Sequence, residues 1–149
     1  MTRLEDALQG VGILGFDTPP VIYFIEANPR YDAVVTEVFA RIHQGSLEGI
    51  TSAVTLAEVL VMPIRRNQLS LRDSYSDLLL NSAHFQTASI TPEITERTAD
   101  LRARYKIRTP DAFQLAVAWA AGCDAFLTND AALARIKELR VLILDDLEL

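Results

Sequence analysis

Four acidic residues are candidates for chemistry, because each lies in an uncharged stretch or directly after an apolar run. They are Asp17, Glu58, Asp111 and Asp130. Four ionised carboxylates brought within a few ångströms would repel one another strongly in a pocket of low dielectric. All-oxygen clusters of this kind are the ligand sets that Mg²⁺ and Mn²⁺ accept. If these side chains converge, the chemistry that they predict is metal-assisted hydrolysis.

Asp111 has a structural interpretation beside the functional one. In "TPD" at 109–111, threonine is expected to cap a helix, proline suits its first position, and an acid interacts favourably with the helix dipole. The chain repeats this pattern in "TPE" at 91–93, so the pattern alone predicts only a helix start. The downstream sequences differ, since "AFQLAVAWAAGC" after Asp111 carries no charge and predicts a buried helix.

Glu58 and Asp17 are each the only charge in a long apolar segment. Glu58 is the only charged residue between positions 49 and 64, within a helical pattern where an unpaired carboxylate is costly to bury. Alternatively, Glu58 occupies a solvent-facing stripe or pairs with a distant arginine, although the predicted helix at 53–64 leaves little polar face for such a stripe. Asp17 is the only charge between positions 7 and 25 and follows a predicted strand, where parallel sheets place their ligand crevice. Its alternative is an ordinary turn aspartate before a proline-rich helix start.

Asp130 follows another predicted strand, at 124–128. The structural interpretation is an N-cap or first-turn acid for the helical pattern after it. Asp130 and Asp17 can share one crevice if their two strands are neighbours in the sheet. Asp124 stands at the opposite end of the same strand and is expected to lie far from that crevice.

Strands and helices must alternate to position these acids. The pattern predicts strands at 11–16, 49–53, 87–90, 124–128 and 140–144. It predicts helices that begin near 19, 32, 53 (capped by Ser52), 71 (capped by Ser70), 92, 110 and 130. Strands separated by helices imply parallel pairing with right-handed crossovers. The expected fold is α/β, a three-layer sandwich with a short parallel sheet of about five strands, in a single domain over 1–149 with its core at about 11–145.

Charge and composition restrict the range of partners. A formal charge of −6 repels nucleic acid overall, so a nucleic-acid role requires a local basic rim or a bound cation. Arg65 and Arg66 could hold phosphates, although two solvated arginines at a helix end explain them equally well. His43 and His84 are expected near helix ends at the surface, and no Cys/His set for zinc is present. With a single cysteine, Cys123, no membrane-length apolar run and no signal-like N-terminus, the expected location is the cytoplasm.

The segments around these acids resemble a known family. Asp17 after a strand, Glu58 in "TLAEVL", and Asp111 and Asp130 in "TPDAFQLAVAWAAGCDAFLTND" are similar to the PIN domain, over residues 11–145. The resemblance is especially to the VapC-like toxins of toxin–antitoxin pairs. It implies a Mg²⁺- or Mn²⁺-dependent ribonuclease that acts on RNA, binds a small cognate antitoxin and forms a homodimer. It also implies that Asp17, Glu58, Asp111 and Asp130 form the catalytic and metal-binding tetrad, with Thr128 beside it.

Two other interpretations remain open. The family usually has a small polar residue two places after the first acid, whereas this chain has Pro19 in "DTPP". Proline removes a donor and a side-chain hydrogen bond from the edge of the site, which favours a PIN-fold interaction module with weak or no nuclease activity. A phosphoacceptor receiver also places aspartates at strand ends. It needs a lysine after its last strands, whereas Lys106 and Lys137 lie in helical patterns.

Overall fold

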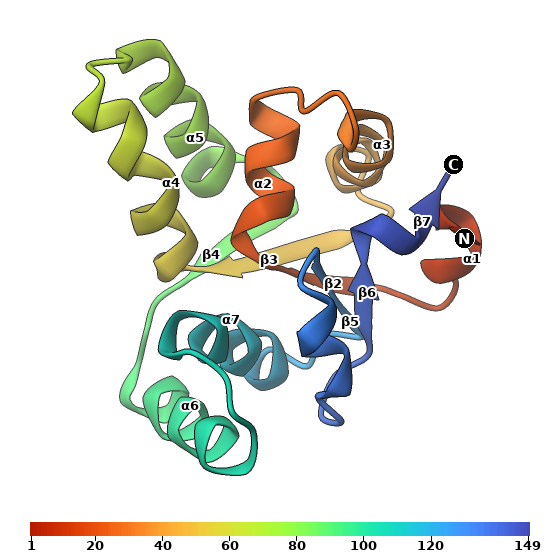
Figure 1. Ribbon diagram of the computed structural model, residues 1–149. Helices are drawn as coiled ribbons and strands as arrows, with labels where there is room; N and C mark the ends of the chain where they lie inside the picture. The colour runs from red at the N-terminus through yellow and green to blue at the C-terminus, as the bar shows by residue number, and fades with distance from the viewer.

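Five short parallel strands form the central sheet, in the order β4-β3-β2-β5-β6 (Figure 1). The computed structural model describes all residues from 1 to 149. The strands are β2 (Ile13–Phe16), β3 (Glu48–Ser52), β4 (Phe85–Ala88), β5 (Ala125–Thr128) and β6 (Val141–Ile143). The chain builds the sheet outwards from β2 to β4 and then continues on the other side of β2 with β5. The strand order therefore reverses between β2 and β5, which is where open parallel sheets form their binding crevice.

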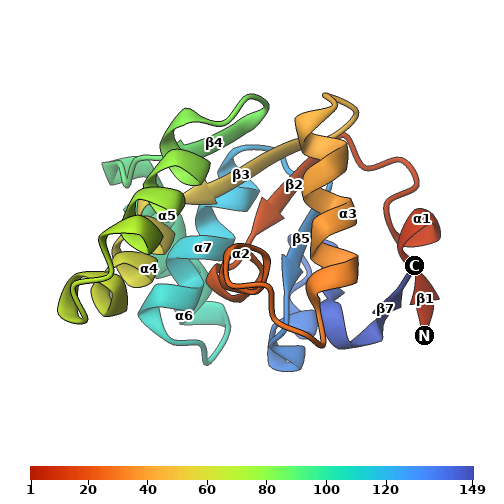
Figure 2. The ribbon, with the colours of Figure 1, turned by 90° about the horizontal axis from the view of Figure 1, so that it is seen from above.

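Helices cover both faces of this sheet (Figures 1 and 2). One face carries α2 (Thr18–Ile25), α3 (Asp32–His43), α4 (Ala53–Arg65) and α5 (Leu69–Asn81), and the other carries α6 (Pro92–Arg104) and α7 (Thr109–Ala120). The buried apolar residues form two clusters, one on each side of the sheet. The predicted three-layer α/β sandwich is confirmed. No helix combines the length and the apolar character that crossing a membrane would require.

Neighbouring residues of β5 and β2 show how the two clusters are separated. Ala125 and Leu127 belong to one cluster and Phe126 to the other, because successive side chains of a strand point to opposite faces. A Cβ atom at Gly15 would lie 2.8 Å from the Cβ of Ala118, so α7 packs directly on the backbone of β2. A larger residue at Gly15 would push away the helix that carries Asp111.

The structure moves several predicted boundaries. Helix α3 begins at Asp32 as predicted, and Ser52 caps α4 by accepting the N–H of Val54 at 3.1 Å. Ser70 is not a cap, because α5 already begins at Leu69 and ends before β4 starts at Phe85. The helix predicted from 130 is also wrong. Only the short 3₁₀ turn η1 (Ala131–Arg135) forms there, and a loop follows. The buried residues Leu133, Ile136 and Leu139 recur every three positions, a spacing that such a turn and loop satisfy as well as an α-helix does.

Both termini contribute to the core. Strand β1 (Thr2–Arg3) pairs in parallel with β7 (Leu147–Glu148), next to α1 (Leu4–Ala7) and the 3₁₀ turn η2 (Leu144–Asp146). Leu4, Ala7 and Leu147 are buried in the larger cluster, so the packed region extends beyond the expected 11–145. Cys123 is half-buried, and its burial raises the pKa of its thiol to about 12. It is therefore a neutral thiol that packs as a small apolar group.

Candidate active site

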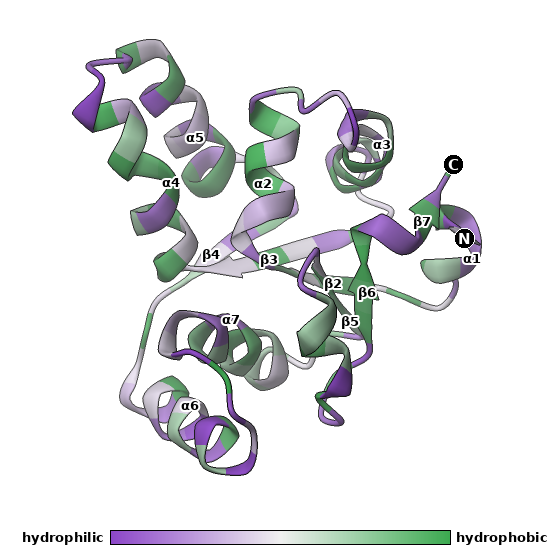
Figure 3. Cartoon of the chain, in the orientation of Figure 1, coloured by the Kyte–Doolittle hydropathy of each residue, from purple (hydrophilic) through white to green (hydrophobic).

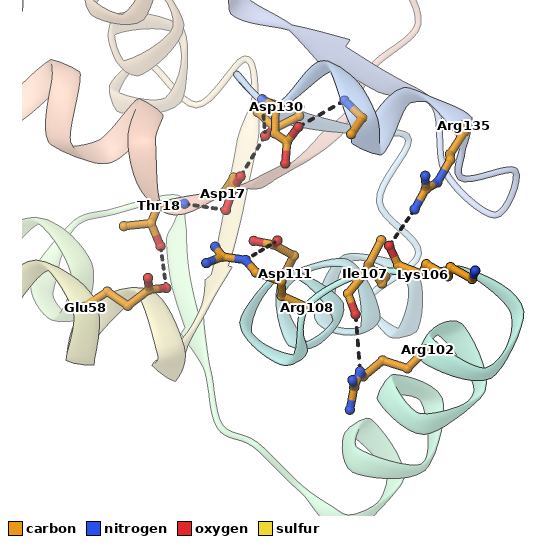
Figure 4. Close-up of polar contacts among 12 residues, drawn as sticks. Asp17, Thr18, Glu58, Arg102, Lys106, Ile107, Arg108, Asp111, Asp130 and Arg135 are labelled. Carbon is orange, nitrogen blue, oxygen red and sulfur yellow. Dashed lines mark hydrogen bonds and ion pairs between the residues drawn. The ribbon is translucent and has the colours of Figure 1, made fainter.

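Asp17 lies at the carboxyl end of β2, between the other candidate acids (Figure 4). Only 6% of the residue is exposed. Its Oδ1 accepts the backbone N–H of Thr18 at 2.9 Å, and its Oδ2 accepts the hydroxyl of Thr128 at 2.7 Å. Thr128 ends β5, which pairs with β2 in a register that matches Phe16 with Leu127. The two strands are neighbours, which was the condition for a shared crevice.

The electrostatics of Asp17 connect it to two other acids. Burial raises the pKa of Asp17, and the hydrogen bonds from Thr128 and Thr18 counteract part of that increase. The charges of Asp111 and Glu58 raise the pKa further. Because charges interact this way only at short range, Asp111 and Glu58 share the electrostatic environment of Asp17. Figure 4 shows the Asp111 carboxylate beside Arg108 and the Glu58 carboxylate beside Thr18.

Asp111 lies in the first turn of α7. The predicted cap is wrong, because α7 begins at Thr109 itself, and Arg108 occupies the N-cap position without a side-chain cap. The Asp111 side chain is only 18% exposed, and its Oδ2 lies 3.4 Å from Nε of Arg108. The Arg108 side chain is 80% exposed, so this ion pair contributes little stability. Arg108 nevertheless places a guanidinium beside the carboxylates (Figure 4).

Glu58 reaches the site from the exposed side of α4. The expectation that α4 leaves little room for a solvent-facing stripe is wrong, because Glu58 is exposed. The helix buries one narrow face and leaves several apolar side chains in solvent, namely Val61, Met62 and Ile64. Burial cost therefore does not distinguish Glu58. Its position is distinctive instead, since Oε1 accepts the hydroxyl of Thr18 at 3.0 Å, one residue from Asp17.

Asp130 fits the structural interpretation and also borders the site. It is the N-cap of η1, where its Oδ1 accepts the N–H of Ala132 at 3.0 Å. Its own backbone N–H donates to the Thr128 hydroxyl at 3.1 Å, and that hydroxyl donates to Asp17. Asp124 stands at the other end of β5 and takes no part. Its carboxylate accepts the N–H groups of Ile13 and Gly12, which lower its pKa.

The donor set suits a hard divalent cation, because every candidate ligand atom is a carboxylate or hydroxyl oxygen. The buried Asp17 carboxyl fits such an ion best, because a cation would offset the burial and the like charges that raise its pKa. No three His, Cys, Asp or Glu side chains are arranged as they stand to hold one ion. Holding a metal would therefore require further movement of side chains, such as that of Asp111, whose carboxylate now contacts Arg108.

A group of basic residues surrounds the loop before α7 and was not predicted. Arg102 donates to the carbonyl of Ile107 at 3.2 Å, and Arg135 donates to the carbonyl of Lys106 at 2.8 Å, so both lie against the loop before α7 (Figure 4). We call the exposed side chains Arg102, Lys106, Arg108 and Arg135 the basic rim. In a chain with a net charge of −6, the basic rim is a candidate for the local cationic surface that a nucleic-acid role requires. It is scattered over three sequence segments, which is why spacing alone did not reveal it.

Buried polar residues form the other feature that the sequence analysis missed. They connect α2, β3, α4 and α7 directly behind the acids and are Thr18, Thr51, Ser52, Thr55 and Gln114. The sequence contains a signal for these residues, because Gln114 is the only polar side chain in the uncharged segment after Asp111. The three polar residues of "TSAVT" likewise stand in an apolar context.

Comparison with solved structures agrees with the fold. A chain of VapBC2 from Rickettsia felis, bound to a DNA fragment from the promoter, is 18% identical and superposes with a TM-score of 0.70 over 88% of this chain and 98% of its own. A toxin–antitoxin complex from Klebsiella pneumoniae gives 23% identity and a TM-score of 0.65, over 89% and 97%. DNA-bound VapBC from Salmonella typhimurium gives 16% and 0.65, over 90% and 98%. At these identities the similarity demonstrates a shared fold.

Sequence comparison identifies the family. No curated protein matches the chain significantly in sequence. The family model of the PIN domain matches residues 16–139 of the 149-residue chain, which span every strand from β3 to β5 and all four candidate acids. Together with the reversed strand order and the position of Asp17 at the carboxyl end of β2, this match shows that the chain belongs to the PIN domain family.

Proposed function

We propose that this protein is a metal-dependent ribonuclease that hydrolyses RNA phosphodiester bonds, and that it is the toxin of a toxin–antitoxin pair. The observation that carries the proposal is the Asp17 carboxyl. It is buried at the switch point of a parallel sheet, with a pKa that burial and the charges of Asp111 and Glu58 raise. Membership in the PIN domain family adds support, because PIN domains are generally nucleases.

Mg²⁺ or Mn²⁺ would be held by Asp17 and Asp111 directly, and by Glu58 and Asp130 directly or through water. The cation would supply an activated water and stabilise the extra negative charge at phosphorus. The chain's own contribution is to hold these oxygens in place. Thr128 and the Thr18 N–H fix Asp17, Thr18 holds Glu58, and the first turn of α7 presents Asp111.

The basic rim supports RNA as the substrate class. Arg108 contacts Asp111, and the other three cations lie around the loop that leads to Arg108, so a polyanion bound along them would reach the carboxylates at Arg108 (Figure 4). Arg65 and Arg66 end α4, seven and eight residues beyond Glu58, or about 10–12 Å along the helix axis. They are candidates to bind phosphates further along the RNA strand. No residue of either group presents a feature that reads a particular base sequence.

The proposed antitoxin is a protein partner, and the exposed apolar residues of α4 and α5 support such a partner. Val61, Ile64 and Leu80 are 47%, 59% and 58% exposed. Exposed large apolar side chains on adjacent helices are typical of protein interaction surfaces. The solved structures with a similar fold come from toxin–antitoxin complexes. We also propose that the protein forms a homodimer, which sedimentation or light scattering of the purified protein would test.

A second candidate function is that of a PIN-fold interaction module with weak or no nuclease activity. Two observations favour it. The acids as they stand do not form a group that could hold one metal ion, and Pro19 occupies the position where the family usually has a small polar residue.

One experiment separates the two functions. Purified protein is incubated with a mixture of structured and unstructured RNAs in Mg²⁺, in Mn²⁺ and in EDTA, and the Asp17→Asn variant, purified identically, is assayed in parallel. The nuclease proposal predicts cleavage that requires metal and is lost in Asp17→Asn. Cleavage of equal strength in the variant would indicate a contaminating nuclease, and absence of cleavage by both proteins would favour the interaction module.

A further inference from the structure

Gln114 lies at the centre of the buried polar residues behind the acids, one helical turn after Asp111 on α7. Only 2% of the residue is exposed. Its Nε2 donates to the hydroxyl of Thr18 at 3.0 Å and to that of Thr55 at 2.6 Å, and its Oε1 accepts the hydroxyl of Ser52 at 2.7 Å. One amide therefore joins α7 to α2, α4 and the end of β3. No buried side-chain polar atom is left without a partner.

The direction of each hydrogen bond in this group follows from the number of hydrogens. The carbonyl of Phe16 can only accept, so Thr51 must donate its single hydroxyl hydrogen to it, at 2.9 Å. The contact of 2.7 Å between Thr51 and Thr55 must then use the hydrogen of Thr55. Thr55 has no hydrogen left for the amide of Gln114 and can only accept from it.

The same count of hydrogens applies to Thr18. It accepts the second N–H of Gln114. Its single hydrogen can go to the Thr55 hydroxyl at 3.2 Å or to the Glu58 carboxylate at 3.0 Å, and the charged, nearer carboxylate is the stronger acceptor. If the amide were turned over, its oxygen would attract the hydrogens of both threonines. The contacts from Thr55 to Thr51 and from Thr18 to Glu58 would then lack a hydrogen, which at these distances is unfavourable. The donor end of Gln114 therefore directs the Thr18 hydroxyl towards Glu58.

We propose that Gln114 is a positioning residue of the metal site, which holds the Glu58 carboxylate beside Asp17 by way of the Thr18 hydroxyl. Glu58 is exposed on α4, and its bond with Thr18 connects it to the residue that follows Asp17. Without that bond, a long exposed side chain populates many rotamers, most of which point away from Asp17. The proposal rests on the proposed metal-dependent function, and its sequence signature is a polar residue three positions after Asp111 in an otherwise apolar helix.

The first test replaces Gln114 by methionine, which has a similar length but no N–H to donate. Binding of Mn²⁺ and of Mg²⁺ to the RNA-free protein is measured by calorimetry. Loss of a residue that holds a metal ligand in place typically weakens metal binding about 10–100-fold, and we expect an effect in that range for Gln114→Met. A crystal structure of the metal-free variant should show the Glu58 carboxylate no longer bonded to Thr18.

Thr98→Val is the matched control for loss of a buried hydrogen bond. Thr98 is 4% exposed and donates its hydroxyl to the carbonyl of Ile94 at 2.8 Å, with no bond to the acids or to Gln114. Both variants should be less stable than the wild type, but only Gln114→Met should bind metal more weakly. Equal loss of metal affinity in the two variants would mean that a general loosening of the fold explains the result, and would overturn the proposal.

Thr18 variants provide a second route that does not depend on the folding of Gln114→Met. Thr18→Ser keeps the hydroxyl and should bind metal as the wild type does, whereas Thr18→Val removes it and should weaken binding as Gln114→Met does. Both residues act through one hydrogen bond to Glu58. The double variant Gln114→Met/Thr18→Val should therefore bind metal no more weakly than either single variant. Independent, additive losses would contradict the proposal.

The outcomes separate this inference from the proposed function. If the wild-type protein binds neither metal, the metal-dependent function fails, and the crystal structure of Gln114→Met still decides whether Gln114 holds Glu58. If the wild type binds metal and Gln114→Met binds it equally well with Glu58 still on Thr18, the positioning role is wrong and the proposed function stands.

Discussion

The chain contains the same three-residue pattern at the start of two adjacent helices, and the two copies differ in structure. In "TPE", Thr91 is the N-cap of α6 and accepts the N–H of Ile94 at 3.2 Å, and the Glu93 side chain is 73% exposed beside Arg97. In "TPD", Thr109 is already inside α7, no side chain caps the helix, and the Asp111 side chain is 18% exposed.

The difference arises from the helix that each pattern begins. Helix α6 is charged along its outer face, while α7 is apolar nearly all round and packs between α6 and the sheet (Figure 3). The close contact of Ala118 with Gly15 seats α7 on β2, so its first turn points at the carboxyl end of that strand. A helix-start acid becomes a candidate ligand when its helix is buried against the central strand, which the pattern itself does not encode.

The largest expected effect is on RNA cleavage by Asp111→Asn. Asparagine has nearly the same shape, so α7 should still form, but the proposed metal site loses a negatively charged ligand. Metal-dependent cleavage should fall by orders of magnitude, measured as initial rates at saturating Mg²⁺. Without metal, the free energy of unfolding of the variant should equal or exceed that of the wild type. The neutral amide no longer repels Asp17, and this gain offsets the loss of about 0.3–1 kcal/mol from the favourable interaction of Asp111 with the helix dipole.

Glu93→Gln is the matched control for Asp111→Asn. It removes the same charge from the same pattern on α6 and should leave cleavage intact. Equal activity of the two variants would return Asp111 to the role of an ordinary helix-start residue and would remove the central support of the nuclease proposal.

The second effect is stabilisation of the fold by metal. An ion that binds only the native state at 100 times its dissociation constant raises the free energy of unfolding by about 2.7 kcal/mol. For a domain of this size that corresponds to an increase in Tm of about 5–10 °C. Thermal unfolding with and without Mg²⁺ or Mn²⁺ should show the increase for the wild type and Glu93→Gln, and a smaller one for Asp111→Asn. A Tm that millimolar metal leaves unchanged in every protein would contradict coupling between the acids and the fold.

The comparison also shows which parts of the molecule the sequence can predict. Periodicity predicts five strands and the helices that separate them, because burial on the two faces of a sheet imposes those periods. Acids that stand alone in an uncharged segment are also recognisable, because burial makes the rest of such a segment apolar. That the four acids form one metal site stays a prediction.

Other features could not be read from the sequence. The expected lack of exposure at Glu58 is wrong because apolar α4 residues such as Ile64 face solvent, which hydropathy cannot indicate. The basic rim and the bonds of Gln114 depend on which distant segments meet. Pairings of this kind, up to 96 residues apart between Gln114 and Thr18, follow from the tertiary fold.

The third effect concerns the two threonines. Thr91→Ala removes a side-chain cap and should lower the free energy of unfolding by about 1 kcal/mol, within a range of about 0.5–2 kcal/mol. Thr109→Ala removes no cap and should change stability by less than about 0.5 kcal/mol. Urea unfolding of both variants measures the difference. A larger cost for Thr109→Ala would mean that Thr109 caps α7 in solution, as the sequence pattern suggested.

The smallest expected effect is electrostatic and connects Asp111 to Asp17. Burial is the largest cause of the raised pKa of Asp17, and the charge of Asp111 is a lesser one, so Asp111→Asn should lower the pKa of Asp17 only in part. Glu93→Gln should leave it unchanged. Carboxyl NMR titration of metal-free protein measures both.

The effect of Asp17 on stability has a definite sign. Because folding raises its pKa, the native state holds this proton more tightly than the unfolded chain does. At a pH below the ordinary aspartate value of about 3.9, both states are protonated and Asp17 imposes no penalty. As pH rises through the raised pKa, the native carboxyl must ionise in its buried position, so this contribution to the free energy of unfolding falls. Urea unfolding across this pH range should show a smaller decrease in the free energy of unfolding for Asp111→Asn than for Glu93→Gln. Identical profiles for the two variants would show that the charge of Asp111 does not reach Asp17.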